Sequence, residues 1–160
     1  MKEFIVALAI FGAYVVVDRY IEQVETIQIK TIRHEYLNTL LDLGIEFPEV
    51  VVAQIMLETA YLSSDIYRNN NNLFGMKYNE RGYAIGIRKG HAAYPNKVAS
   101  IKDYKEWQDM VLKLCKQNGM RVTTTEDYLY VLDHLPLCDN CRYAEDKLYT
   151  KKLRFIIKLL

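Results

Sequence analysis

The stretch VVVAQIMLETAYLSS, from Val50 to Ser64, decides how this sequence is interpreted. Glu58 is the only charged residue in the run, and apolar residues fall on almost every side of a helix drawn through it. A helix that is apolar nearly all the way round is buried in its protein. An ionised carboxylate there is costly unless it is paired or protonated. Glu58 is therefore either half of a buried salt bridge or a carboxyl of raised pKa, which a general acid working near neutral pH needs.

The segments that follow resemble a known family. NNLFGMK (Asn71 to Lys77), SIKDYKEWQ (Ser100 to Gln108) and YAEDKLYTKKL (Tyr143 to Leu153) come in this order after the Glu58 run. Together with AQIMLETA, these blocks resemble the signature of the glucosaminidase family of bacterial cell-wall hydrolases (glycoside hydrolase family 73). The match extends over most of the chain, and the combination is more specific than any single block.

The resemblance implies that the protein hydrolyses the glycan strand of peptidoglycan at a β-1,4 bond to N-acetylglucosamine. Glu58 would be the acid that protonates the leaving oxygen, and no cofactor or metal is implied. A lytic transglycosylase is the nearest rival, since it uses a single glutamate but ends by internal attack of the sugar's own hydroxyl. A third interpretation is a non-catalytic wall-binding or virion structural protein, although such a protein would be expected to lose the acid.

A second carboxylate is harder to assign. Family members often carry another glutamate in the β-lobe, but residues 92–100 contain no acid, and Glu80 is the only carboxylate of the lobe. Glu80 is a catalytic candidate that would reach over the cleft, although an ordinary exposed charge is the favoured interpretation. Without it, the substrate's 2-acetamido group attacks or a tyrosine positions water. By resemblance Tyr143 lies beside the catalytic centre; the alternative is a core tyrosine bonded to the main chain.

Four residues are candidates for substrate binding. By resemblance Asn71, Asn72 and Phe74 line the groove, and Tyr94 is assigned to it with them because aromatic rings stack well on sugars. Asparagine side chains also hold loops and helix ends, so a structural role for both stays open. Phe74 is either a sugar-stacking platform or a core residue. Gly75 is expected to let the chain pass close to the Glu58 helix.

The first residues differ in character from the rest. Residues 1–19 include FIVALAIFGAYVVV (Phe4 to Val17), a run without a charge. The run is short for a bilayer core of about 30 Å, and it fits a signal or an uncleaved anchor better, with a buried apolar helix as the alternative. Residues 20–33 would connect it to a catalytic domain over 34–160. Export or membrane association through residues 4–17 suits an enzyme of the bacterial envelope or a phage.

The fold class follows from the remaining pattern. We expect a mostly α (α+β, lysozyme-like) domain, with a small β-hairpin lobe between Met76 and Asn96 flanking the cleft. Pro48 opens the Glu58 helix, which we expect to end between Ser64 and Tyr67. Ser100, with Asp103 three residues on, has the spacing of a capping box and would begin the next long helix.

Charge and cysteines exclude some functions. A formal net charge of +1 without a basic stripe gives no sign of nucleic-acid binding. Cys138 and Cys141 form a C-x-x-C pair, with Cys115 and His134 as further ligands if the site held zinc. The spacing matches no usual zinc module. A disulfide among the three cysteines and plain reduced thiols both stay open.

Overall fold

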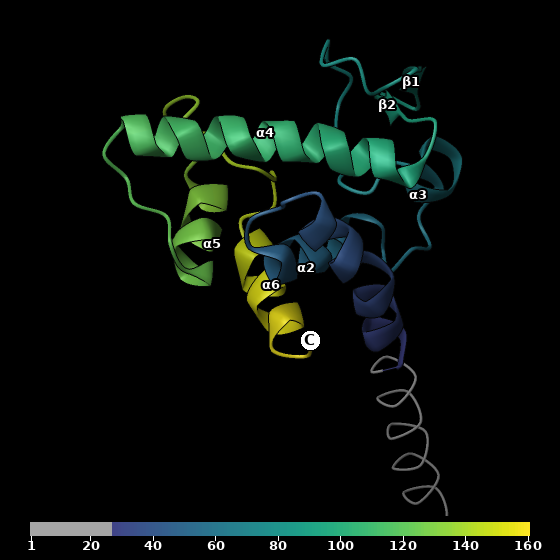
Figure 1. Ribbon diagram of the computed structural model, residues 1–160, viewed down its shortest axis with the longest axis horizontal. Helices are drawn as coiled ribbons and strands as arrows, with labels where there is room; N and C mark the ends of the chain where they lie inside the picture. Colours follow the sequence, from purple (N-terminus) through teal and green to yellow (C-terminus); the bar gives the residue numbers. More distant parts are fainter. Residues whose placement is uncertain (1–26) are drawn as a thin grey trace, which may run out of the picture.

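The structure, a computed structural model, describes residues 27–160 (Figure 1). The apolar run over residues 4–17 therefore lies outside the described residues. A helix over residues 27–42 comes first, and Ile29 and Ile32 on it are buried in the common core. The boundary expected at residue 33 thus falls inside this helix. Within residues 27–160, no helix has both the length and the apolar character needed to cross a membrane.

The Glu58 helix, α2 (Pro48–Glu58), lies at the centre of the domain. Pro48 opens it as expected, and its residues 50–56 are all fully buried. α2 packs against the last helix, α6 (Tyr149–Ile157), which also contacts α5 (Thr125–Asp133). The longest helix, α4 (Lys97–Gln117), runs across one side of this group (Figure 1). The sequence around Glu58 is apolar on all sides because α2 is buried on all sides over residues 50–56.

α2 ends at Glu58, and the expected end near Ser64 was wrong. Residues 60–62 adopt left-handed backbone angles, with φ of 47°, 53° and 65°, which no α-helix can include. The hydroxyl of Thr59 donates a 2.6 Å hydrogen bond to a carbonyl one turn earlier and accepts the N–H of Leu62. A separate short helix, α3 (Asp65–Asn70), then begins after Ser64. Glu58 therefore lies at the end of a helix, where the core meets the surface.

The β-lobe is a two-stranded antiparallel sheet, which confirms the expected hairpin. β1 (Gly86–Arg88) pairs with β2 (His91–Ala93), and Ile87 lies opposite Ala92. The sheet lies at one end of α4 and beside α3 (Figure 1). The observed architecture is mostly helical with this one small lobe, as a lysozyme-like domain requires.

The start of α4 differs from the expectation. Asn96 is the N-cap, and its side chain accepts the N–H of Ala99 at 2.9 Å. Ser100 and Asp103 lie inside the helix and are fully buried. The Ser100 hydroxyl accepts the N–H of Leu73 at 3.1 Å, so it holds the loop after α3. Their capping-box spacing was misleading because both side chains fix other segments to the helix.

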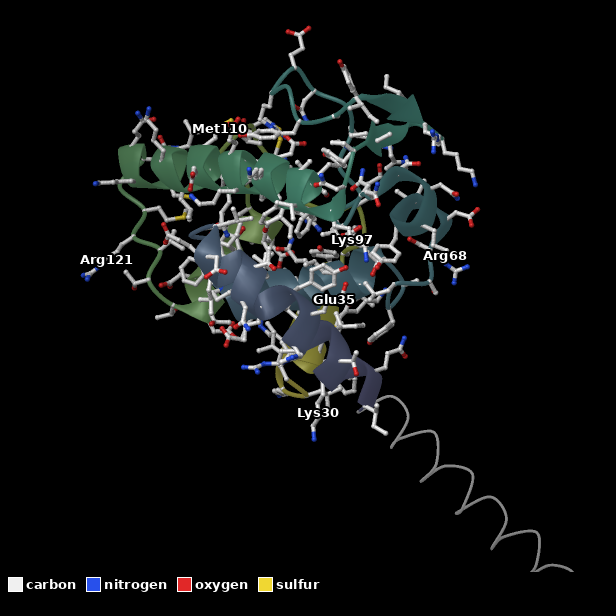
Figure 2. All side chains as sticks on the ribbon, turned by 45° about the vertical axis from the view of Figure 1, so that its right-hand side comes forward. Lys30, Glu35, Arg68, Lys97, Met110 and Arg121 are labelled. Carbon is white, nitrogen blue, oxygen red and sulfur yellow. A yellow bond between two sulfur atoms is a disulfide. The ribbon has the colours of Figure 1, made fainter. Side chains whose placement is uncertain are left out.

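Polar contacts join the first helix to the rest of the domain. Glu35 on that helix and Lys97 at the start of α4 point toward one another, with 3.4 Å between the charged atoms (Figure 2). Lys97 also hydrogen-bonds the hydroxyl of Tyr67 on α3. Three helices therefore meet at Lys97.

The cysteines form one disulfide. Cys138 and Cys141 are bonded to each other, and Cys115 is a buried free thiol on α4. Among residues 27–160, no group of three or more His, Cys, Asp and Glu side chains is arranged to hold a metal ion. The disulfide lies in the segment between α5 and α6.

Candidate active site

A groove of about 480 Å³ opens beside the C-terminal end of α2. Its walls come from the loop after α3, from β2, from α4 and from the segment between α5 and α6. It is lined by Glu58, Phe74, Gly75, Met76, Lys77, His91, Trp107, Leu135, Arg142, Tyr143, Ala144 and Glu145. A slightly larger hollow of about 560 Å³ lies near the far end of α4, but it contains no residue of the four sequence blocks. The groove at Glu58 is therefore the candidate active site.

Glu58 is half-buried in the wall of this groove. Burial raises the pKa of its carboxyl, and a hydrogen bond from the Tyr149 hydroxyl acts in the opposite direction. The same hydroxyl accepts a hydrogen bond from the Gln54 amide at 3.3 Å, so two helices hold the group behind Glu58. The carboxyl also lies at the C-terminal, negative end of the α2 dipole, which disfavours its ionised form. These surroundings favour a carboxyl that keeps its proton.

Gly75 faces Glu58 across a very short distance. A Cβ atom added at Gly75 would lie 3.0 Å from Oε2 of Glu58. The backbone at Gly75 is left-handed, with φ of 64°, a conformation that glycine adopts without strain. The prediction that this glycine lets the chain pass close to the Glu58 helix is therefore confirmed.

Tyr143 lines the groove beside Glu58. Its hydroxyl donates a 3.0 Å hydrogen bond to the carbonyl oxygen of Phe74. Its ring lies between those of Trp107 and Tyr149, at centroid distances of 5.1 and 5.5 Å. Burial and the nearby charge of Glu58 raise the pKa of Tyr143 well above its usual value. The two interpretations of Tyr143 are compatible, because one side chain borders the groove and bonds to the main chain.

Residues 35–160 match the family described as mannosyl-glycoprotein endo-β-N-acetylglucosaminidase, the glucosaminidase family. The chain belongs to the glucosaminidase family. It is accordingly a glycoside hydrolase of the endo-β-N-acetylglucosaminidase type. No curated protein matches the sequence.

A solved structure has the same fold. The catalytic domain of the autolysin Auto from Listeria monocytogenes is similar, with a TM-score of 0.58 and 22% sequence identity. The similarity covers 82% of this chain and 83% of that domain. The expected lysozyme-like class of this glucosaminidase is thereby confirmed.

The other predicted binding residues fall into two groups. Phe74 borders the groove, but it is only 2% exposed and stacks on Tyr104 at 4.1 Å. Asn71, Asn72 and Tyr94 are not among the groove residues. The Asn72 amide makes four hydrogen bonds to the main chain, at 2.9 to 3.2 Å. In this structure, these side chains fix the loop that forms the groove wall.

Asn71 and Tyr94 join the same loop to the lobe. The Asn71 amide donates to the carbonyl of Tyr94 at 3.1 Å. The Tyr94 hydroxyl donates to the buried carboxylate of Asp103 at 2.6 Å. Burial and Asp103 raise the pKa of Tyr94. The NNLFG block thus contributes mainly hydrogen bonds that hold the base of the lobe.

Glu80 lies apart from the groove. It is exposed on the loop that precedes β1, and it is not among the groove residues. Its neighbours Asn79 and Arg81 bond to Asp103, at 3.0 and 2.5 Å. The structure therefore does not bring Glu80 together with Glu58.

Sequence reasoning missed four charged or titratable groove residues, Lys77, His91, Arg142 and Glu145. Lys77 Nζ lies 3.2 Å from Nε2 of His91, whose Nδ1 contacts the carbonyl of Lys89 at 2.9 Å. Arg142 and Glu145 are exposed in the segment between α5 and α6. Glu145 belongs to the YAED segment, but it lies in a loop. Side-chain direction in a loop follows no periodic pattern, so the sequence does not indicate that Glu145 faces the groove.

Proposed function

We propose that this glucosaminidase hydrolyses the β-1,4 glycan strand of peptidoglycan at N-acetylglucosamine. Glu58 is the general acid. The observation that carries the proposal is a carboxyl of raised pKa in the wall of an open groove. Its proton passes to the glycosidic oxygen as the bond to the sugar C1 breaks, and the sugar becomes oxocarbenium-like. The similarity to an autolysin catalytic domain supports the cell wall as the source of the substrate.

The groove has the chemistry of a sugar-binding site. Trp107 and Tyr143 supply aromatic surface, against which the apolar faces of sugar rings pack. Lys77 and Arg142 place positive charge at the same groove, which suits the carboxylates of peptidoglycan peptides. Tyr143 lies beside the reacting bond, and the nearly fully buried Phe74 supports the groove wall from behind. Asn71, Asn72 and Tyr94 act on substrate through the loop that they hold.

The test is the release of reducing sugar from purified peptidoglycan by the full chain and by its Glu58→Gln variant. Glutamine keeps the shape and cannot donate the proton, so we expect activity to fall by about 100- to 10,000-fold while binding survives. Equal activity of the two proteins would disprove the role of Glu58. Mass spectrometry of the products distinguishes the lytic transglycosylase, because an anhydro sugar replaces the reducing end.

The place of action is part of the proposal. Residues 1–19 would direct export, and the apolar run 4–17 would associate with the membrane. Residues 20–33, whose last part belongs to the first helix of the domain, would join them to the rest of the catalytic domain. The enzyme would then face the bacterial cell wall, whether it is encoded by a bacterium or a phage. Fractionation of cells that express the full chain tests this, and we expect the protein with the envelope. Recovery with the cytoplasm would contradict it.

A further inference from the structure

We infer that Glu145 is the second catalytic carboxylate of this groove and the base that activates water. The inference rests on the proposed function, since it concerns the same glycosidic bond. Glu58 and Glu145 are the two carboxylates among the described residues that line the groove. They come from separate parts of the chain, the end of α2 and the segment before α6. The β-lobe acid that the family often carries has no counterpart at residues 92–100, and Glu80 lies outside the groove.

The two carboxylates have different surroundings, as the two roles require. Glu58 is half-buried beneath Gly75 and against Tyr149, whereas Glu145 is exposed to solvent. A glycosidase needs one carboxyl that keeps a proton to donate and one that accepts a proton from water. Exposure gives Glu145 access to that water. The environment therefore assigns the acid to Glu58 and the base to Glu145.

The segment that carries Glu145 is fixed on both sides. Before it, the N–H of Tyr143 bonds to the carbonyl of Leu132 at 2.8 Å, and the Tyr143 hydroxyl is bonded to Phe74. After it, Asp146 accepts the N–H of Leu148 at 2.8 Å and pairs with Lys152 at 2.6 Å. The main chain at Glu145 is therefore anchored on both sides, while its side chain is exposed. Catalytic groups need this preorganisation.

The step balances as a hydrolysis. Glu145 removes a proton from water while the water oxygen forms a bond to C1 of the sugar. The bond from C1 to the glycosidic oxygen breaks, and that oxygen takes the proton of Glu58. Glu145 ends protonated and Glu58 ends as a carboxylate, and exchange with solvent restores both. Water is the co-reactant, and the step needs no metal or oxidant.

The experiment compares Glu145→Gln and Glu145→Ala with the unchanged full chain on soluble glycan-strand fragments. We expect kcat to fall by about 100-fold or more, with little change in KM or in the thermal midpoint. Sodium azide added to Glu145→Ala should restore turnover, because the small anion attacks C1 where the base is missing. The product should then be a glycosyl azide, detected by mass spectrometry. The matched control is Glu126→Gln, which alters an exposed carboxylate paired with Arg154 on another face.

Each outcome decides the assignment. A loss of kcat with azide rescue supports Glu145 as the base. The assignment is overturned if the kcat of Glu145→Gln stays within threefold of the unchanged protein, if only KM changes, or if azide restores nothing. Failure of the proposed function would be seen in different measurements. Either the unchanged protein would not cleave the glycan, or the Glu58→Gln variant would be as active as the unchanged protein.

Discussion

The α2 helix and the β-lobe both contribute to the wall of one groove, but they are held by different forces. Residues 50–56 of α2 are fully buried among apolar neighbours. In the lobe, Ile85 and Ile87 are 73% and 65% exposed, so the hairpin has little core of its own. It is attached by hydrogen bonds at its base, among them bonds to Asn70, Asn72 and Asp103. Apolar burial thus positions the acid, whereas a few polar side chains position the β-lobe.

Asp103→Ala is expected to have the largest effect, because it should loosen the β-lobe and leave α2 unchanged. Asp103 is buried, and it accepts hydrogen bonds from Asn79, Arg81 and Tyr94. Removing one partner of a buried charged network costs about 3–5 kcal/mol. We expect the lobe to detach locally, with faster amide exchange over residues 79–94 and loss of activity, while α2 stays protected. Native exchange measured by mass spectrometry checks this.

The control for Asp103→Ala is Asp109→Ala on the same helix. Asp109 pairs with Lys105 at the surface, and such a pair is worth about 0.3–0.5 kcal/mol. If amide exchange over residues 79–94 is equally fast in both variants, the attachment of the lobe does not depend on Asp103.

Gly75→Ala tests the close approach between the loop after α3 and Glu58 at the end of α2. The left-handed backbone costs an alanine about 1–2 kcal/mol, and its Cβ would crowd the carboxylate of Glu58. Gly90→Ala is the matched control, because its φ of 73° imposes the same strain with no atom within 4 Å. We expect similar losses in unfolding free energy but a larger loss of kcat for Gly75→Ala. Equal kcat values would show that the contact with Glu58 does not matter.

The contribution of Glu58 to the stability of the fold decreases as the pH rises. Because burial raises the pKa of Glu58, the folded protein holds a proton that the unfolded chain has released. The resulting stability is fully present below the unfolded pKa of about 4.3 and is lost as pH rises through the higher folded pKa. kcat/KM should fall as pH rises through the pKa of the protonated acid, provided that Glu58 is the donor.

The Glu58→Gln variant checks this sign, since it has no carboxyl to titrate. We expect the thermal midpoint of the unchanged protein to fall relative to that of the variant as pH rises from the unfolded to the folded pKa of Glu58, and the difference to stay constant above the folded pKa. Parallel midpoint curves for the two proteins would contradict the raised pKa.

The smallest effect is expected from Glu80→Gln in the exposed lobe. Glu80 is exposed and lies outside the groove, so its solvated charge has little influence on Glu58. We expect kcat/KM to change less than about threefold, as for most surface substitutions. A loss of kcat/KM similar to that of Glu145→Gln would indicate that Glu80 in the lobe is the second catalytic carboxylate.

Much of the fold and part of the site could be predicted from local sequence. The apolar run around Glu58 indicated a buried helix with one uncompensated charge, and the glycine-rich stretch indicated the lobe. The end of α2 was missed because residues 60–62 take left-handed angles that apolar periodicity does not reveal. Ser100 was misassigned as a cap because its partner, the N–H of Leu73, is distant in sequence.

The sequence by itself determined that a carboxyl would lie on a buried apolar helix, since burial of the helix follows from side-chain chemistry and helical spacing. Tertiary structure decided what surrounds that carboxyl. It placed Gly75 against Glu58, bonded Tyr143 to Phe74, and brought Glu145 into the same groove. Those contacts join segments far apart in the chain, and only the packing of α2, α4 and α6 determines which loop residues meet.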